Sequence, residues 1–262
     1  MQPSNTHPDP WHAKPMPQCA PVPPSYHGVW VRTLLETPQL CDTTTLVRWM
    51  QLGRWHADLR VPTSARVTHP GVLMPYSAAD STLLKTVQQG FCGITQVTRS
   101  EAGEVCTWHR LVDYQPPAPT PDAGWMVFEN PETVIETGIH GIYREVWQRL
   151  PQSTGRMLAL AEPARTDGQA SARLLLAGDY AMRVRPAAHA AALSQADPSV
   201  EISFGLLQAN QWHVQHSTWP ALEGQHMGLS IQRTSGSEAL VHMDNASALW
   251  EILEWSEEPG AV

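Results

Sequence analysis

The densest group of ionisable side chains on a flexible backbone lies between Glu136 and Tyr143. It contains His140 between two glycines, Gly138 and Gly141, and glycines that interrupt an extended segment indicate a bulge or a close backbone approach. An acid and a base that converge in one pocket support proton transfer without a cofactor, as in lyases, isomerases and hydrolases. One hypothesis therefore assigns proton acceptance to Glu136 and proton donation to Tyr143. A purely structural bulge is the alternative.

A second candidate for the proton acceptor is His109, in the sequence Trp108-His109-Arg110. Neighbours along a strand point to opposite faces, so Trp108 and His109 do not enter one cavity unless a bulge intervenes. Trp108 has a counterpart later in the chain, Trp212, and is interpreted as inward-facing and structural. His109 then faces outward or lies in a crevice between two modules. A histidine with an ordinary pKa of about 6.5 suits general base catalysis. The simpler interpretation is that His109 is a surface residue without a catalytic role.

The segment 55–61 alternates between an apolar face and a face that carries His56, Asp58 and Arg60. The usual arrangement buries the apolar face and leaves the charged face in water. Packing against a neighbouring module inverts this arrangement. Asp58 and Arg60 then line a pocket, in which Arg60 binds a carboxylate through two hydrogen bonds. The sequence leaves both arrangements open, and the recurrence of Arg185 at the matching place favours the second.

Three tryptophans and a second arginine complete the predicted binding site. These residues are Trp30, Trp49, Trp108 and Arg32. If Trp30 faces the interior, strand alternation places Arg32 on the same side, where a buried guanidinium needs a carboxylate from the protein or from a ligand. Arg32 or Arg60 would then receive the anionic group of a small ligand, and the tryptophans would hold its apolar or aromatic body. An Arg32 that is paired within the protein is the alternative.

No metal site and no cofactor site is expected. His213 and His216 have opposite strand parity, and His56 with Asp58 supplies two ligands where catalytic zinc has three. The sequence contains no P-loop, no GxGxxG after a strand, no HExxH and no GxSxG. The four cysteines lack CxxC spacing and are interpreted as free thiols. They are Cys19, Cys41, Cys92 and Cys106.

The elements that must position these residues occur twice along the chain. Markers between Gly28 and Arg149 recur in the same order between Gly155 and Trp255, which predicts two similar modules. The markers of the first copy are Gly28, Arg48, Gly53, Trp55, Arg60, Pro62, Phe91, Gly93, Gln96, Trp108 and His109. Their partners in the second copy are Gly155, Arg173, Gly178, Tyr180, Arg185, Pro186, Phe204, Gly205, Gln208, Trp212 and His213.

Each copy consists of short alternating segments separated by turn-forming residues, which is typical of an antiparallel meander. The predicted strands of the first copy are 29–35, 44–52, 55–61, 91–98, 105–114, 125–129, 134–135 and 142–147. Those of the second copy are 157–161, 172–177, 180–184, 201–207, 212–216, 228–233, 239–243 and 250–255. Strand edges must be protected from other chains, so we predict an all-β fold of two tandem antiparallel barrels.

Short helical insertions and a tail complete the predicted organisation. A helix is expected at 77–89, ended by Gly90, and a shorter one at 187–195. Prolines rule out regular strand pairing near the N-terminus, so we predict a proline-rich tail at 1–26, a first barrel at 27–150 and a second at 151–262. The tail is interpreted as disordered or draped over the surface, with docking of Trp11 left open.

Composition narrows the classes of partner. Charged residues make up 16% of the chain and the net charge is −8, so no basic stripe is present and nucleic acid is not expected as a partner. No apolar run approaches the roughly 20 residues that cross a bilayer, and the N-terminus lacks the pattern of a secretory signal. We therefore expect a cytoplasmic protein without a membrane partner. A homodimer is left open.

Gly28-Val29-Trp30 resembles the GxW signature of lipocalins and related calycin barrels. The resemblance implies that Trp30 closes the barrel floor beneath an arginine of the last strand, a part assigned to Arg144. The second copy has Gly155-Arg156-Met157 and lacks the floor tryptophan. The closing segment 136–148 is also similar to a poorly characterised fungal family of two tandem lipocalin-like barrels. Secreted lipocalins carry a TDY-type motif, a signal peptide and disulfides, none of which is found here.

These observations predict a small-molecule-binding protein whose functional site lies in the first barrel. The expected ligand is apolar or aromatic and carries an anionic group. The catalytic candidates are Glu136, His109 and Tyr143, and the ligand-binding candidates are Trp30, Arg32, Trp49, Asp58, Arg60 and Trp108. Binding without turnover is one alternative. A cytoplasmic interaction scaffold with filled barrels and no ligand is another.

Overall fold

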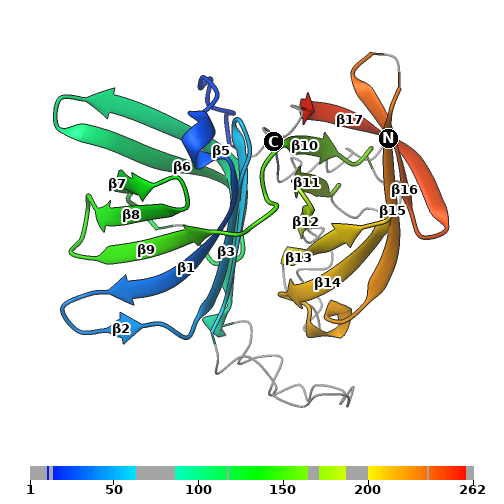
Figure 1. Ribbon diagram of the computed structural model, residues 1–262. Helices are drawn as coiled ribbons and strands as arrows, with labels where there is room; N and C mark the ends of the chain where they lie inside the picture. Colours follow the sequence, from blue (N-terminus) through cyan, green and yellow to red (C-terminus); the bar gives the residue numbers. More distant parts are fainter. Residues whose placement is uncertain are drawn as a thin grey trace, which may run out of the picture.

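The computed structural model describes residues 11, 14–62, 86–116, 118–164, 171–186, 200–234 and 236–257. Two closed eight-stranded antiparallel barrels lie side by side (Figure 1). The all-β fold of two tandem barrels, predicted from the alternation of short segments, is confirmed.

In the first barrel β1 pairs with β3, each later strand pairs with the next along the chain, and β1 pairs with β9 to close the wall. The two-residue β2 pairs with the last two residues of β1, Leu35 and Glu36. The strands are β1 (Gly28–Glu36), β2 (Cys41–Asp42), β3 (Leu46–Gln51), β4 (Trp55–Val61), β5 (Gln89–Ser100), β6 (Gly103–Asp113), β7 (Asp122–Asn130), β8 (Thr133–Gly138) and β9 (Arg144–Arg149). A short 3-10 helix, η2 (Pro24–Tyr26), precedes β1.

The second barrel repeats the meander and closes through pairing of β10 with β17. Its strands are β10 (Arg156–Ala161), β11 (Arg173–Ala177), β12 (Tyr180–Pro186), β13 (Val200–Gln208), β14 (Gln211–Ser217), β15 (His226–Arg233), β16 (Glu238–Met243) and β17 (Ala246–Glu257). A second 3-10 helix, η5 (Pro220–Leu222), follows β14. Every strand predicted from the sequence overlaps one of these strands.

The two predicted helices can be compared with the structure only in part. Most of the helix expected at 77–89 and the whole of that at 187–195 lie outside the described residues. Thr86 and Val87 are helical, as predicted, but the helix ends before the expected position, because Gln89 and Gly90 belong to β5. Gly90 lies where a Cβ atom would come within 2.5 Å of the Asp58 carbonyl oxygen and of Ile202 in the second barrel. Its lack of a side chain permits close packing between the barrels rather than the end of a helix.

The repeat is clearest at a bulge that both barrels share. The register shifts at Gly93 between β5 and β6, and at Gly205 between β13 and β14. A Cβ atom on Gly93 would collide with the carbonyl oxygen of His109, and one on Gly205 would collide with that of His213. These glycines and histidines therefore occupy matching positions, as the marker order predicted.

Other marker pairs are not structurally equivalent. Phe91 lies in the interior of the first barrel, whereas Phe204 packs in the core between the barrels. Trp30 is likewise interior, but Met157 faces the first barrel and leaves the interior of its own barrel to Leu158 and Leu160.

A third core joins the two barrels and inverts the alternation of several strands. The apolar residues Trp55, Ala57 and Leu59 of β4 pack in one cluster with Met182 and Ile202 of the second barrel. Because this outer face is buried, the opposite face of β4, which carries His56, Asp58 and Arg60, points into the first barrel. The inverted arrangement is therefore the one adopted by β4.

The N-terminal segment contributes to the same junction. Trp11 is 1% exposed, and its indole nitrogen donates a 2.7 Å hydrogen bond to the Ser171 carbonyl of the second barrel. Its ring packs edge-on against Trp55 of the first barrel, with ring centroids 6.3 Å apart, and the Arg173 guanidinium lies 4.5 Å from the ring centroid. The described part of the proline-rich segment thus docks at Trp11, the alternative that the sequence left open.

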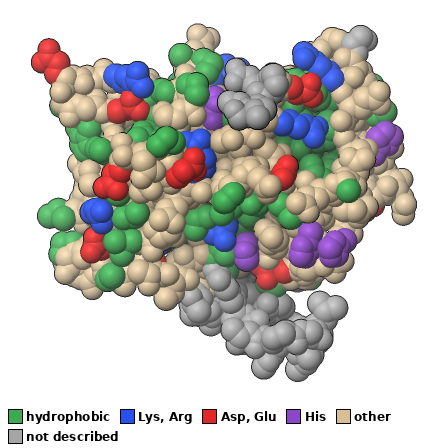
Figure 2. All heavy atoms as spheres, viewed as in Figure 1, with side chains coloured by type: hydrophobic (Ala, Val, Ile, Leu, Met, Phe, Trp, Pro, Cys, Tyr) green, Lys and Arg blue, Asp and Glu red, His purple; other side chains and the backbone are tan. Residues whose placement is uncertain are grey.

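The surface face shown in Figure 2 carries Lys and Arg side chains scattered among acidic and apolar ones. Within the described ranges, the structure contains no helix that is both long and apolar enough to cross a membrane.

Candidate functional site

Aromatic side chains fill the middle of the first barrel. Trp49 contacts three other tryptophans, with ring centroids 6.2 Å from Trp30, 5.5 Å from Trp108 and 5.6 Å from Trp147. Trp30 and Trp49 are at most 2% exposed. Strand alternation thus directs the three predicted tryptophans inward, and β9 supplies a fourth, Trp147, that the sequence analysis missed.

At the floor of this barrel an arginine packs over Trp30, as expected, but it is Arg149 and not Arg144. Its guanidinium lies 4.7 Å from the centroid of the Trp30 ring and donates to the His27 carbonyl at 2.9 Å. The Trp30 indole nitrogen donates to the Tyr26 carbonyl at 2.7 Å.

The assignment of this part to Arg144 was wrong. In the pairing of β1 with β9, Trp30 is opposite Arg149, whereas Arg144 is opposite Glu36 at the other end of both strands. Arg144 forms an exposed ion pair with Glu36 at 3.2 Å. The two arginines are the first and last residues of the six-residue β9, so they lie at opposite ends of the strand.

A buried polar network lies close to the aromatic layer. The Thr95 hydroxyl donates to Gln51 at 2.6 Å and lies 2.9 Å from the His56 ring nitrogen Nδ1. His56 is fully buried, and this burial lowers its pKa well below the ordinary value, so that the ring is neutral.

The opposite end of the barrel holds a cavity of about 380 Å³, here called the mouth cavity. Charged and polar side chains line one part of it, and Leu35, Pro62 and Val87 supply apolar surface. The polar lining comprises Arg32, Thr37, Thr45, Arg60, Gln89, Asp122, Glu136, Tyr143 and Glu145. A separate space of only about 10 Å³ is bounded by Trp49, Trp108 and Trp147 among others, and shares Arg60, Asp122 and Glu136 with the lining of the mouth cavity.

Arg32 and Arg60 line the mouth cavity and already have carboxylate partners. Arg32 binds Glu145 at 2.7 Å and Asp42 at 3.1 Å, and Arg60 binds Asp58 at 2.7 Å. The alternative of an Arg32 paired within the protein is therefore the one that the structure adopts.

A third arginine, Arg110, lies at the wall of the same barrel end. It binds Asp122 at 2.5 Å and Asp113 at 3.4 Å. Its guanidinium is stacked 3.6 Å from the centroid of the Phe91 ring, and that of Arg60 lies 5.4 Å from the same centroid. Both cations thus lie close to the same aromatic ring.

Glu136 differs from these carboxylates, because within the described chain it forms no ion pair. It is 4% exposed, and its carboxylate accepts hydrogen bonds from the Tyr143 hydroxyl at 2.7 Å and from the Trp147 indole at 3.1 Å. Glu145 is its direct cross-strand neighbour. Burial, and then the charge of Glu145, raise the pKa of Glu136 well above the ordinary value of 4.5. Glu136 is therefore suited to hold a proton at a pH at which exposed carboxyl groups are ionised.

Tyr143 is positioned by the same hydrogen bond. Its hydroxyl is held on Glu136, and burial together with the adjacent carboxylate raises the pKa of the phenol. The structure thus brings together two of the three predicted catalytic residues, Glu136 and Tyr143.

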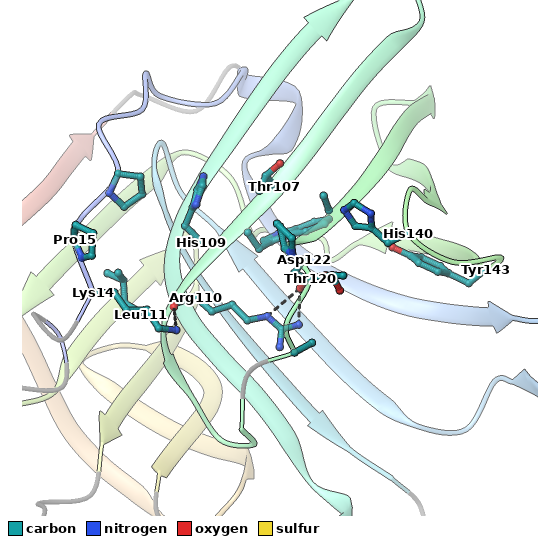
Figure 3. Close-up of a pocket in the computed structure, with 15 residues that line it drawn as sticks. Lys14, Pro15, Thr107, His109, Arg110, Leu111, Thr120, Asp122, His140 and Tyr143 are labelled. Atoms are coloured by element: carbon teal, nitrogen blue, oxygen red, sulfur yellow. Dashed lines mark hydrogen bonds and ion pairs between the residues drawn. The ribbon is translucent and has the colours of Figure 1, made fainter.

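His109 lies elsewhere, on the outer side of β6. It lines a second cavity of about 520 Å³ beside the wall, together with Lys14 and His140 (Figure 3). Its Nε2 atom is 3.0 Å from the Gln96 side-chain oxygen, and partial burial lowers its pKa. Asp122 and Tyr143 line both cavities, but His109 does not line the mouth cavity.

Sequence reasoning missed Asp122, Glu145 and Trp147 as residues of the site. Glu136 and Glu145 are placed symmetrically about the turn that joins β8 to β9, so a hairpin register drawn about that turn would have paired them. No comparable signal marks Asp122, because its role depends on Arg110 from a neighbouring strand.

The second barrel has a different polar interior. Arg183 binds Glu201 at 2.6 Å, and Glu201 also accepts a hydrogen bond from Ser203 at 2.8 Å. The Arg183 guanidinium lies 5.4 Å from the centroid of the Trp212 ring. Arg183 and Glu201 are paired with each other, which is typical of a structural ion pair.

Among the described residues, no three His, Cys, Asp or Glu side chains are grouped to hold a metal ion. Cys19, Cys41, Cys92 and Cys106 are free thiols, and burial raises the pKa of Cys92 to about 12. A buried thiol of such high pKa is a poor nucleophile.

Comparisons of the chain with protein-family models, with curated proteins and with solved structures find no match. The two closed eight-stranded antiparallel barrels fit a lipocalin-like fold in general.

Proposed function

We propose that the first barrel binds a small polar molecule in the mouth cavity and exchanges a proton with it through Glu136. The observation that carries the proposal is the buried Glu136 carboxyl, which lines a cavity and lacks an ion-pair partner among the described residues. A buried carboxyl of this kind holds a proton at a pH at which exposed carboxyls are ionised. Such a group serves as a general acid or base near neutral pH.

The dimensions of the cavity limit the ligand. The space of about 10 Å³ between the tryptophans holds about one water molecule, whereas the mouth cavity of about 380 Å³ is large enough for a small organic molecule. The ligand therefore lies above the aromatic layer, and its apolar part contacts Leu35, Pro62 and Val87. In this proposal the predicted binding residues Trp30, Trp49 and Trp108 form the packed layer beneath the ligand.

Tyr143 controls the proton of Glu136 in this proposal. The 2.7 Å hydrogen bond from its hydroxyl favours the carboxylate, whereas burial favours the protonated acid. A ligand atom that approaches Glu136 can take its proton or supply one, with Tyr143 rotating its hydroxyl hydrogen to match. This chemistry suits a cofactor-free lyase, isomerase or hydrolase, and binding without turnover uses the same contacts.

The resemblance to calycins provides a wider hypothesis. We propose membership of that superfamily, supported by Gly28-Val29-Trp30 at the start of β1 and by Arg149 packed over the Trp30 ring. Membership of the fungal family of tandem lipocalin-like barrels and a cytoplasmic location are further proposals.

Native mass spectrometry of freshly purified protein, followed by denaturation to weigh any released molecule, tests the binding proposal. We expect a stoichiometric small molecule in the wild type and its loss in Thr45→Phe, which fills the mouth cavity. Thr98→Phe, on an exposed position of β5, is the matched control and should retain the molecule. Retention of the molecule by Thr45→Phe would place it elsewhere. A wild-type protein that takes up nothing from a metabolite extract would contradict binding altogether.

A further inference from the structure

We infer that the ligand of the mouth cavity is an organic cation, a primary or secondary ammonium ion, which replaces the proton on Glu136. This inference rests on the proposed function and adds the ligand's charge class and the coupling of its binding to proton release.

The balance of charge at the barrel mouth carries the inference. Lys14 supplies one positive charge, which acts on Asp113. Even so, three arginines, Arg32, Arg60 and Arg110, are surrounded by more carboxyl groups than these cations can neutralise. Their ion-pair partners are Asp42, Asp58, Asp113, Asp122 and Glu145. Glu136 adds a further carboxyl with no arginine of its own. If every group were ionised, this partly buried region would carry a net negative charge, which a low-dielectric site does not tolerate without protons or bound cations.

The excess of negative charge is concentrated around Glu136. Glu145 on β9 and Asp122 on β7 both act on Glu136 as like charges, and the buried thiol of Cys106 on β6 lies close enough to sense its charge. Arg60 on β4 opposes them, but its guanidinium is held by Asp58. In the ligand-free protein, a proton on Glu136 removes one negative charge.

An ammonium group can take the place of that proton. A primary ammonium supplies three N–H donors and a secondary one supplies two. Tyr143 and Trp147 provide Glu136 with one donor each and leave further lone pairs on the carboxylate. Glu136, Glu145 and Asp122 all line the mouth cavity, so an ammonium at Glu136 meets an acidic wall. A charge-assisted hydrogen bond between an ammonium and a carboxylate is stronger than one between neutral groups.

An anionic ligand fits this arrangement less well. To bind one, Arg32 would have to release Glu145 or Asp42, and Arg60 would have to release Asp58. The carboxylate set free would then lie next to the incoming anion. The anionic group expected from the sequence assumed free arginines, and their pairing removes that assumption.

Isothermal titration calorimetry with benzylamine, benzyl alcohol and benzoate tests the charge class, because the three probes share a ring and differ in charge. At pH 7 we expect benzylamine to bind at least tenfold more tightly than the other two. Repeating the titration in buffers of different ionisation enthalpy should reveal the release of protons from the protein on binding. Glu136→Gln should weaken benzylamine binding at least tenfold and abolish the proton release.

Glu251→Gln, at an exposed position of β17 in the second barrel, is the control and should bind benzylamine as the wild type does. Tyr143→Phe keeps the carboxyl of Glu136 and should retain proton-linked binding, which protects the test against misfolding of Glu136→Gln. Preferential binding of benzoate, lost in Thr45→Phe, would overturn the cationic class and leave the small-molecule site intact. Undiminished benzylamine binding by a folded Glu136→Gln variant would also overturn the inference. The absence of binding by all three probes at millimolar concentration would overturn the inference too. The native mass spectrometry experiment would then test separately whether the barrel binds a small molecule at all.

Discussion

At the residue scale, one carboxyl group determines what the mouth cavity can do. Glu136 was a candidate from the sequence because it lies in a glycine-containing segment with His140 and Tyr143. The bulge expected in that segment is wrong, because β8 ends at Gly138 and β9 begins at Arg144, which makes the segment a turn. The structure adds what the sequence does not contain, namely the burial of Glu136, the Tyr143 and Trp147 donors and the like charge of Glu145. These contacts come from the register of the hairpin between β8 and β9.

The raised pKa of Glu136 predicts a dependence of stability on pH. Because the folded protein holds this proton more tightly than the unfolded chain, stability is lost as the pH rises from the ordinary value near 4.5 through the folded pKa. Glu136→Gln should remove this loss and stabilise the protein by about 1 kcal/mol or more at pH 8, with little effect at pH 4. Urea unfolding of both proteins at the two pH values checks this. A variant that is less stable than wild type at pH 8 would contradict it.

Tyr143→Phe should raise the pKa of Glu136 further. The phenol hydroxyl donates to the carboxylate and favours the ionised form, so its removal favours the protonated form. The loss of the hydrogen bond should cost about 1 kcal/mol of stability. Carbon-13 NMR of the Glu136 carboxyl during a pH titration measures the change, and a lowered titration midpoint would count against the assigned hydrogen bond.

At the element scale, the strands were predictable and their orientation was only partly so. Short alternating segments separated by turn residues located every described strand except the two-residue β2. The sequence of β4 left open which face is buried, because that depends on contacts with the second barrel, in particular those of Trp55, Ala57 and Leu59. The floor arginine was misplaced for a related reason. Arg144 and Arg149 both belong to β9, and only the register with β1 decides which one reaches Trp30.

The shared bulge makes a prediction for both barrels. Gly93→Ala and Gly205→Ala each place a methyl group against a backbone carbonyl that cannot easily move, and each should destabilise the protein by about 1–3 kcal/mol. Gly141→Ala is the control, because nothing lies within 4 Å of its Cβ position, and it should change stability by less than about 0.5 kcal/mol. Chemical denaturation compares the three. Equal stabilities would show that the bulge does not need glycine.

Substituting each of the two arginines of β9 in turn tests which one stabilises the barrel floor. Arg149→Ala removes the cation over Trp30 and the hydrogen bonds to backbone carbonyls, and should cost about 2–3 kcal/mol. Arg144→Ala removes an exposed ion pair with Glu36 and should cost about 0–1 kcal/mol. Thermal unfolding of the two variants ranks them, and the reverse order would restore Arg144 to the role predicted from sequence.

At the scale of the whole molecule, the two barrels share a core and are joined by the N-terminal segment. The β3–β4 hairpin is also bound by the second barrel, because the Glu254 carboxylate accepts from the backbone N–H groups of Gly53 and Arg54. These contacts between distant parts of the chain carry no local sequence signal. The docking of Trp11 could be raised as an alternative from sequence, but its partners could not be identified.

Trp11→Ala should weaken the junction of the barrels. Loss of a fully buried tryptophan costs about 3–5 kcal/mol, here divided between contacts to Trp55 and to Ser171 of the other barrel. Met16→Ala, at an exposed position of the same segment, should cost less than about 0.5 kcal/mol. Calorimetric unfolding should show a lower transition temperature in Trp11→Ala alone. Equal transition temperatures for both variants would mean that the segment does not join the barrels.

The most direct measurement of the proposed chemistry is a carbon-13 NMR titration of the Glu136 carboxyl, assigned by its absence in Glu136→Gln and repeated with benzylamine. We predict a titration midpoint well above 4.5 in the free protein and a lower one when the amine is bound. A midpoint at or below 4.5 in the free protein would mean that Glu136 is an ordinary ionised carboxylate. That result would contradict the proposed proton exchange through Glu136.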